Sequence, residues 1–425
     1  MNYQQFFKKA KEKDISNIQI TEKHSIDSSV EIINGKIESF EDYDNIDYNI
    51  KAEYHFKTVK TSSNYLEEDI LDQIIMKAEA TDSKYEDEYL EKKEKIAVKK
   101  PIDFEISKEI NILKELEKIR EKYKEVKKLT TYFGENYTNT RIINSNGVDI
   151  STDSHLCNFM VEAIVEVDGE FTSFDRQILT TNKSTIDFYA FTKDVIEKAI
   201  IESKKEKIET KKYDIILDSY VAGRILSHLS EMLSAANIRN KISCLDNKIG
   251  EKIFNQNLTI VEDPTDKKYP GYRLFDDEGT ATTKKIIVEK GKLNTYLYNI
   301  KEAKMKETTS TGNGYQGIGT RNMYIIPGKY SLEEMMQEMK DGIYIVDYMG
   351  ASGTSINTVN GSISLQIFGF VVKNGKIESG LEPSIMTTTI FELLSNIEKV
   401  GDDLKFTATS SASPSLWIKG ISIAR

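Results

Sequence analysis

Two-residue turn signals recur along this chain, and most of them separate segments in which apolar and polar residues alternate. The first lies at Asn34-Gly35, inside the stretch from Ser29 to Phe40. Asparagine and glycine tolerate the positive φ angles of a type I′ turn, and alternation at period two is typical of a strand with one buried face. This stretch therefore predicts a β-hairpin. Similar signals follow at Asn146-Gly147, Asp168-Gly169, Gly291 and Asn374-Gly375.

Segments with apolar residues three and four positions apart lie between the hairpins and predict amphipathic helices. One of them begins at Ser331, whose side chain can cap a helix together with Glu334 three residues later. Helices are predicted over residues 3–13, 66–80, 107–129, 192–210, 220–237, 331–340 and 389–400. Further strands are predicted over residues 48–58, 141–144, 156–167, 170–179, 214–218 and 344–348.

The composition changes near residue 211, since five of the six prolines and most of the glycines follow that point. An earlier boundary is expected between residues 91 and 101, where a lysine-rich stretch ends at Pro101. We therefore expect an α+β fold with a mixed N-terminal half and a β-rich C-terminal domain. The expected units are an N-terminal α+β domain over 1–95, a central helix-and-hairpin domain over 101–210 and the C-terminal domain over 211–425.

Charge and composition exclude several classes of protein. The net charge of −10 and the mixing of lysines with acids argue against nucleic-acid binding, which needs a basic face. No apolar run approaches the roughly 20 residues that cross a bilayer, and Met1 to Lys13 lacks the apolar core of a secretory signal. Cys157 and Cys244 lie far apart and form no CxxC pair. We therefore expect a cytoplasmic protein without membrane contact, disulfide framework or thiolate zinc site.

No two of the four histidines lie within helical reach of one another, so the sequence holds no HExxH or HxxxH zinc pair. His228 lies in the predicted helix over 220–237, where a lone histidine is usually a packed or capping residue. Glu231, three residues later, is on the same face and could accept a hydrogen bond from it. No catalytic residue is assigned from the histidines, which are His24, His55, His155 and His228.

Residues 309–319 hold four glycines within eight positions, which indicates a backbone with unusual φ angles or a close approach to a neighbour. No Gly-Lys-Ser/Thr follows, so this is no phosphate-binding loop. Two interpretations remain, a mobile surface loop and a loop that lines a peptide groove or a partner interface. Residues 349–357 form a similar segment, with a tight turn as the alternative. The candidate groove or interface residues are Thr311, Gly312, Asn313, Gly314, Gly350 and Gly353.

Five stretches of the C-terminal half, taken in order, resemble the TldD/PmbA family. They are residues 227–236, 258–264, 275–282, 308–314 and 342–350, the last running on to 396–404. The resemblance covers residues 213–425 well and the upstream part more loosely. It implies an assembly of paired subunits that degrades or trims peptides inside a shared cavity. One type of subunit carries zinc on an HExxxH helix, with a further cysteine ligand near the C-terminus.

Most of the zinc ligands that this resemblance implies are missing here. His228 falls at the first histidine position, but Leu229 takes the glutamate position and Leu233 the second histidine position, and no cysteine follows Cys244. Leucine can neither bind zinc nor accept a proton from a metal-bound water. The chain is therefore similar to the PmbA/TldE branch, with His228 a relic of the first ligand position. We expect no metal, no cofactor and no catalytic residue on this chain.

The resemblance also implies the partners. It implies a TldD-like subunit that carries the zinc, an unfolded peptide as substrate, and a homodimer when no partner is present. The chain is then a subunit of a cytosolic metallopeptidase complex and is catalytically silent on its own. Two alternatives stay open. One is a stand-alone peptidase with an unrecognised site, and the other is a non-enzymatic interaction protein, since the family also carries the label of modulator of DNA gyrase.

Overall fold

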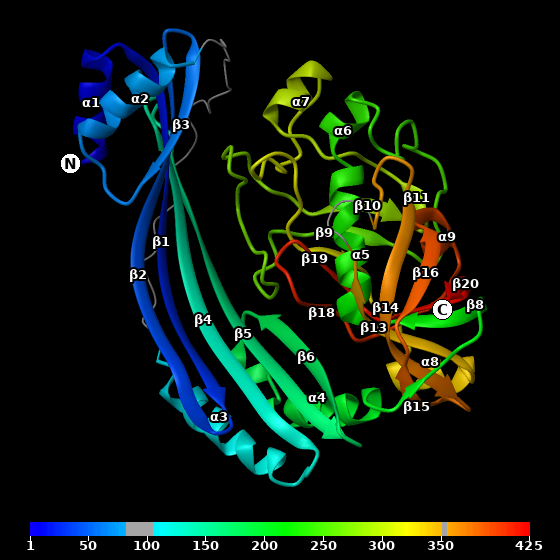
Figure 1. Cartoon of the computed structure of the whole chain (residues 1–425). Coiled ribbons are helices and arrows are strands. Elements are labelled where there is room, and N and C mark those ends of the chain that lie inside the picture. Colours follow the sequence, from blue (N-terminus) through cyan, green and yellow to red (C-terminus); the bar gives the residue numbers. More distant parts are fainter. Residues whose placement is uncertain (82–104, 351–354) are drawn as a thin grey trace.

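The computed structural model describes residues 1–81, 105–350 and 355–425. A long twisted sheet lies beside a β-rich C-terminal domain (Figure 1). The described residues combine helices with extensive, mostly antiparallel sheets, so the predicted α+β class is confirmed. The boundary predicted between residues 91 and 101 lies outside the described residues. In the described part of the chain, no helix combines the length and the apolar character needed to span a membrane.

In the described residues, the N-terminal sheet has six antiparallel strands. They are β1 (Ile15–Ile33), β2 (Lys36–Tyr54), β3 (Lys57–Ser63), β4 (Val126–Asn144), β5 (Asp149–Val167) and β6 (Glu170–Thr180). Their order is β3-β2-β1-β4-β5-β6. Because β1 pairs with β4 along 15 residue pairs, the first two predicted units contribute to one continuous sheet.

The hairpin turns decide where these strands end. Asn34 and Gly35 have φ angles of 48° and 76°, which confirms the turn predicted between β1 and β2. His55 and Phe56 also have positive φ angles, 49° and 63°, and they form a second turn between β2 and β3. The single strand predicted over 48–58 was therefore wrong. Neither turn residue is glycine or asparagine, so the usual signal for positive φ is missing.

Helices cover one face of the sheet at both of its ends. They are α1 (Tyr3–Glu12), α2 (Asp69–Glu79), α3 (Ser107–Arg120) and α4 (Phe188–Glu202), with a short 3-10 turn, η1 (Lys183–Thr185). On β1, Ile18 and Ile20 belong to the apolar core that contains α1 and α2, while Val30 and Ile32 belong to the core that contains α3 and α4. These even-numbered positions share one face of the strand. The other face, which holds Gln19, therefore faces the C-terminal domain.

Two predicted helices end earlier than their apolar spacing indicated. The helix predicted over 107–129 stops at Arg120, and Val126 already begins β4. Residues 129–133 are rich in threonine and aromatic residues, and their pairing with β5 outweighs the helical pattern. The helix predicted over 192–210 stops at Glu202 and is followed by the strand β7 (Lys205–Glu206).

The outer edge of β2 is open over much of its length. β3 pairs only with the stretch from Tyr48 to Tyr54, and within the described ranges no strand pairs with the outer side of residues 36–47. Four large apolar side chains are exposed there, Ile37, Phe40, Tyr43 and Ile46. They alternate with five carboxylates, Glu38, Glu41, Asp42, Asp44 and Asp47.

The C-terminal domain contains two sheets. One has the order β11-β10-β9-β12-β19-β18, with β9 (Ile260–Glu262), β10 (Lys285–Glu289), β11 (Lys292–Leu293), β12 (Met323–Ile325), β18 (Lys405–Phe406) and β19 (Ser411–Ser413). The other has the order β13-β8-β20-β16-β14-β15-β7, with β8 (Lys211–Leu217), β13 (Gly342–Met349), β14 (Ser362–Lys373), β15 (Lys376–Leu381), β16 (Ser384–Thr389) and β20 (Leu416–Ala424). β13 also pairs with β14, so that β13, β8, β20, β16 and β14 form a closed ring.

Five helices accompany these sheets in the described part of the domain, and α5 lies at its centre (Figure 1). They are α5 (Ser219–Met232), α6 (Ala235–Arg239), α7 (Ile300–Met305), α8 (Leu332–Met339) and α9 (Ile390–Ser395). The predicted capping box of Ser331 and Glu334 is present on α8. The helix predicted over 220–237 is interrupted at Ser234, which bridges to Leu297. The helix predicted over 389–400 ends at Ser395, and β17 (Ile397–Val400) pairs with β20 instead.

Gly291, in the turn between β10 and β11, provides a sharp test of this packing. Its φ is +81°, and an added Cβ would lie 2.2 Å from the carbonyl oxygen of Phe254. We expect Gly291→Ala to destabilise the domain by about 3 kcal/mol or more, because backbone atoms have to move. Gly147→Ala is the matched control, since Gly147 has φ +88° but no atom near the added Cβ. Its strain alone should cost about 1 kcal/mol. Thermal unfolding of both variants measures the difference, and equal losses would contradict the crowding at Gly291.

Candidate functional site

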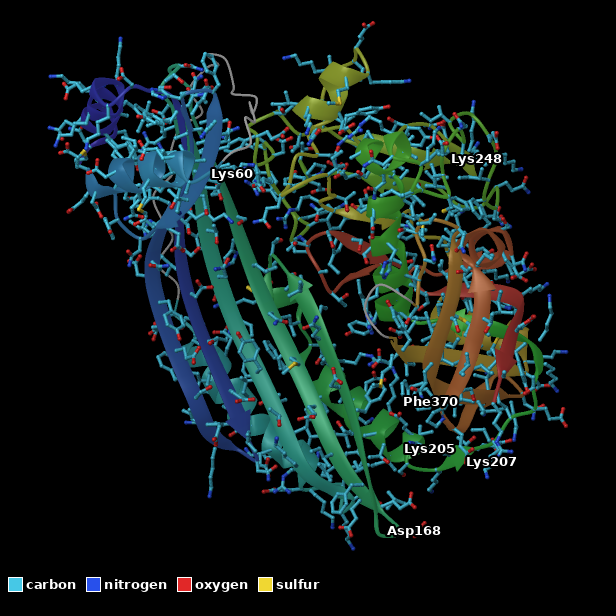
Figure 2. All side chains as sticks on the ribbon, turned by 45° about the horizontal axis from the view of Figure 1, so that its top comes forward. Lys60, Asp168, Lys205, Lys207, Lys248 and Phe370 are labelled. Atoms are coloured by element: carbon cyan, nitrogen blue, oxygen red, sulfur yellow. The ribbon has the colours of Figure 1, made fainter. Side chains whose placement is uncertain are left out.

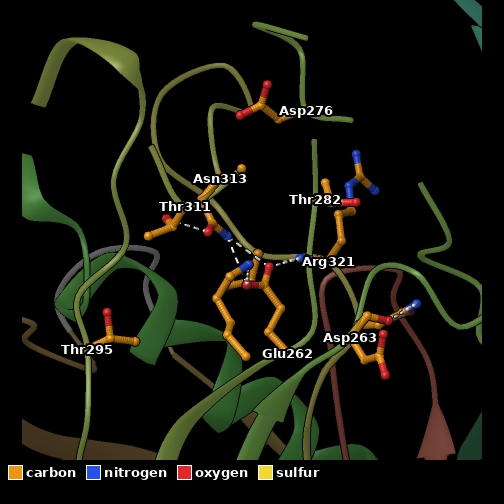
Figure 3. A network of polar contacts seen from close by, with 12 residues as sticks. Glu262, Asp263, Asp276, Thr282, Thr295, Thr311, Asn313 and Arg321 are labelled. Atoms are coloured by element: carbon orange, nitrogen blue, oxygen red, sulfur yellow. Dashed lines mark hydrogen bonds and ion pairs between the residues drawn. The ribbon is translucent and has the colours of Figure 1, made fainter. Parts of the chain in front are cut away.

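A fully buried carboxylate, Glu262, lies at the centre of a polar network in the C-terminal domain (Figure 3). The side-chain amide of Asn313 donates to both of its oxygens, at 2.8 and 3.0 Å. The backbone N–H of Arg321 donates at 2.9 Å, and the ammonium of Lys285 lies at 2.8 Å. The carboxylate thus has an ion-pair partner and several hydrogen-bond donors, which buried charges require.

The predicted residues Thr311, Gly312, Asn313 and Gly314 come together around this network. The hydroxyl of Thr311 donates to Asn313 Oδ1 at 2.7 Å. Gly312 has φ +71°, and an added Cβ there would lie 2.6 Å from the carbonyl oxygen of Ala281. Asn313 is fully buried and Gly312 and Gly314 are also buried, so this part of the loop lies inside the protein and not at its surface.

Asp276 stabilises the other side of the glycine-rich segment over residues 309–319, the glycine loop. Its carboxyl accepts hydrogen bonds from the backbone N–H groups of Glu278 at 3.0 Å, Thr280 at 2.8 Å and Gly314 at 2.9 Å. Burial raises the pKa of Asp276 to about 7, although the bonds from Gly314 and Thr280 oppose that shift. The loop is therefore held by two separate buried carboxyl groups.

A cleft of about 880 Å³ lies between the N-terminal sheet and this loop. Gly314, Gln316 and Gly317 border it on the side of the C-terminal domain. The opposite wall comes from β1, β2, β3 and α2, and it includes Lys60, which Figure 2 labels. Of the predicted groove residues that the structure describes, Gly314 is the one that borders this cleft.

Residues 351–354 of the second predicted loop, Gly353 among them, lie outside the described residues. Gly350 follows β13 and is exposed. An added Cβ at Gly350 would lie 2.3 Å from the Ser355 hydroxyl oxygen. The small size of the residue therefore allows a close approach within its own loop.

His228 is half-buried on α5. Burial lowers the pKa of His228, which Glu231 partly opposes. No hydrogen bond joins the two side chains among the described residues, so the partner suggested by their spacing does not form one. Leu229 and Leu233 are each 1% exposed and belong to the apolar core of the C-terminal domain.

A group that the sequence analysis missed lies on the N-terminal sheet. Glu135, His155 and Cys157 bring one potential metal ligand each to within 4.8 Å of one another. His155 Nε2 lies 2.7 Å from Glu135 Oε1, and the Lys183 ammonium lies 2.8 Å from Glu135 Oε2. Burial raises the pKa of the Cys157 thiol to about 12. The Asn146-Gly147 turn could have revealed the pair, since Glu135 and Cys157 lie opposite each other across that hairpin.

Comparison with models of known protein families identifies the family of this chain. The profile described as the PmbA/TldA metallopeptidase central domain matches residues 99–202, and the profile of the C-terminal domain matches residues 210–425, just over half of the chain. The chain belongs to the PmbA/TldD family. The C-terminal match begins near the predicted boundary at residue 211, whereas the domain limits themselves stay a prediction.

Individual relatives of the PmbA/TldD family agree with this assignment. A metalloprotease PmbA homolog of Buchnera aphidicola is 31% identical over 208 residues, covering 49% of this chain and 45% of the relative. An uncharacterised protein of Methanocaldococcus jannaschii is 31% identical over 296 residues, covering 66% of this chain and 65% of that protein. These matches span less than two thirds of the length of either relative.

Two solved structures share the fold over almost the whole chain. TldE from Thermococcus kodakarensis superposes with a TM-score of 0.86 at 19% identity, covering 99% of both chains. A protein of Thermotoga maritima described as a candidate modulator of a DNA gyrase gives a TM-score of 0.87 at 24% identity, also covering 99% of both chains. At these identities, the likeness establishes the fold of the PmbA/TldD family member and not its activity.

Proposed function

We propose that this chain is the zinc-free, PmbA/TldE-like subunit of a cytosolic TldD/TldE-type peptidase. The observation that supports this proposal is the environment of Leu229 and Leu233. Aligned with the HExxxH motif, they replace the glutamate and the second histidine, and both side chains pack in the apolar core of the C-terminal domain. A zinc ion needs nitrogen, sulfur or oxygen ligands facing an accessible site. The motif positions of α5 do not fit that requirement.

The group on the N-terminal sheet does not fit zinc either. Zinc binds thiolate, whereas burial raises the pKa of the Cys157 thiol to about 12 in the metal-free chain, so a zinc ion would first have to displace that proton. The positive charge of Lys183 already lies against Glu135. Burial alone would raise the pKa of Glu135, yet the hydrogen bonds from His155 and Lys183 lower it, as in an ion pair. We therefore assign no metal to this chain and expect zinc on a TldD-like partner.

In this proposal the chain encloses and positions an unfolded peptide while the partner performs hydrolysis. The cleft beside Gly314 supports such a role, because it has two walls and a largely polar lining that can accept a peptide backbone. The same proposal expects this chain to form a homodimer when the partner is absent, because a surface that binds a related subunit also has affinity for a second copy of the chain.

Elemental analysis of the purified chain after dialysis tests the proposal directly. We expect no stoichiometric zinc and no peptidase activity from the chain alone, and activity once an HExxxH-bearing relative is added. A finding of about one zinc ion per chain, bound with micromolar affinity, would contradict the proposal. Activity of the metal-free chain alone would favour the stand-alone peptidase instead.

His228 is the residue that a motif search would select as catalytic. We expect His228→Ala to cost about 1–3 kcal/mol of stability, from lost packing on α5. The peptidase rate of the assembled complex should stay within a few-fold of wild type. Removing the glutamate of the partner's HExxxH motif should cost orders of magnitude, because it is a general base. A hundredfold loss from His228→Ala, with assembly intact by size-exclusion chromatography, would place chemistry on this chain.

A further inference from the structure

The cleft beside the glycine loop is basic, although the chain as a whole is acidic. Six cationic side chains and three carboxylates line it, a net charge of +3, whereas the whole chain carries −10. The cations come from two walls. Lys23, Lys51, Lys60 and Lys77 belong to the N-terminal part, while Arg239 and Lys301 belong to the C-terminal domain.

Two of the three carboxylates are already neutralised by arginines. Glu302 makes two hydrogen bonds with Arg239, at 2.9 and 3.0 Å. Asp277 lies 2.7 Å from Arg273, a residue outside the cleft lining. The positive charge that remains in the cleft is therefore carried mainly by lysines.

Lys23 and Lys77 have no acidic partner in the described part of the chain. Lys23 is half-buried on β1. Lys77, on α2, donates a hydrogen bond to the neutral hydroxyl of Thr61 at 2.8 Å. Lys77 is exposed, whereas Lys23 is partly desolvated. Two ammonium groups without counter-charge on one wall of a cleft attract an anionic ligand.

Gln19 adds a separate observation on the same wall. Its side chain is 4% exposed and lines the cleft, yet its Oε1 has no hydrogen-bond partner among the described residues. A buried acceptor without a donor costs free energy, so a ligand that brings an N–H or O–H group gains by binding there. The unsatisfied oxygen therefore indicates a ligand that carries donors as well as negative charge.

We propose that this cleft binds an acidic stretch of polypeptide. Acidic side chains meet Lys23 and Lys77, and a backbone N–H of the same segment donates to Gln19 Oε1. The backbone of a nucleic acid offers phosphate charge but no N–H or O–H donor at its phosphates, so it would leave Gln19 Oε1 without a partner. The volume of about 880 Å³ lies in the range of small-ligand pockets, so a short segment is bound rather than a folded domain. This inference rests on the proposed function, in which the chain encloses peptide substrate, and it specifies the class of peptide.

Fluorescence anisotropy with the purified full chain tests the proposal. Four labelled probes of equal length are compared: a glutamate-rich peptide, the same peptide with glutamine in place of glutamate, a lysine-rich peptide and a single-stranded oligothymidylate. We expect the glutamate peptide to bind about tenfold or more tightly than its glutamine counterpart, with a preference that weakens as salt is added. Equal affinity for the two peptides, or tighter binding of the oligothymidylate, would overturn the proposal.

Matched variants locate the site. Lys23→Gln with Lys77→Gln should weaken binding of the glutamate peptide by about fivefold or more, whereas Lys108→Gln with Lys114→Gln, on the exposed side of α3, should change it less than about twofold. Both double variants remove two positive charges. Equal losses of affinity would therefore show that the peptide is attracted by the overall charge of the chain, and would contradict binding in this cleft. Gln19→Leu should weaken the glutamate and glutamine peptides by the same factor, and an unchanged affinity for both would contradict the backbone contact.

These measurements use neither a partner subunit nor peptidase activity. Acidic selectivity in a chain that is found to bind zinc would leave the cleft assignment intact and remove only the zinc-free proposal. If a zinc-free chain activates its partner but shows no preference for the acidic peptide, the proposed function stands and the cleft assignment is contradicted.

Discussion

Replacing Glu262 by alanine is expected to destabilise the C-terminal domain by about 3–5 kcal/mol. Glu262 is fully buried, and its removal leaves the ammonium of Lys285 and the amide of Asn313 without their partner. An unpaired buried charge costs more than the lost attraction itself, because nothing else compensates its desolvation. The fluorescence of Trp417, the only tryptophan, follows the unfolding of this domain in urea.

Two further variants make this result specific. Glu262→Gln keeps a hydrogen-bond acceptor but loses the charge, so its cost should fall between those of wild type and alanine. Glu289→Ala, at an exposed position on the neighbouring strand β10, should change stability by less than about 0.5 kcal/mol. If Glu262→Ala and Glu289→Ala were equally mild, the network would not hold the glycine loop in place.

Rebuilding the zinc motif on α5 should fail and should cost stability. The double change Leu229→Glu and Leu233→His writes HExxxH into the sequence, but both positions are 1% exposed inside the apolar core. We expect a loss of about 4 kcal/mol or more, because a carboxyl and an imidazole become buried among aliphatic side chains. We also expect no stoichiometric zinc by elemental analysis.

Ser230→Glu provides the control on the same helix. Ser230 is only half-buried, so a carboxylate there can remain hydrated, and the cost should stay below about 1 kcal/mol. A stable double variant with one tightly bound zinc would show that two leucines alone separate this chain from a zinc-bearing subunit. That result would also place the face of α5 in reach of substrate.

Local signals in the sequence predicted local structure well. The turn at Asn34-Gly35 and the capping box of Ser331 with Glu334 depend on neighbouring residues, and both are present. The central part of β4 was not predicted, because residues 135–140 are mostly polar and show no alternation. These residues are extended because β1 and β5 pair with them on both sides, which no local pattern records.

The glycine loop was found for the right physical reason, but its surroundings were not. Glycines and small residues at 311–314 predicted a close approach of backbone, and Gly312 does pack against Ala281. Glu262 was overlooked because it precedes an acidic residue and a proline, a context typical of an exposed strand end. It lies 51 residues before Asn313, so only the tertiary fold brings the two together. The cleft could not be predicted for the same reason, since its walls come from residues 19–77 and 236–317, which lie far apart in the sequence.

An open strand edge is a template on which another molecule can add a strand, and long apolar edges promote aggregation. On the outer side of β2, five carboxylates lie among the four exposed apolar side chains. Two such edges brought together would place like charges opposite one another, which disfavours the growth of a sheet from molecule to molecule. A homodimer of this chain should therefore bury a different surface. The protection therefore depends on the negative charges along the edge and not on the apolar side chains between them.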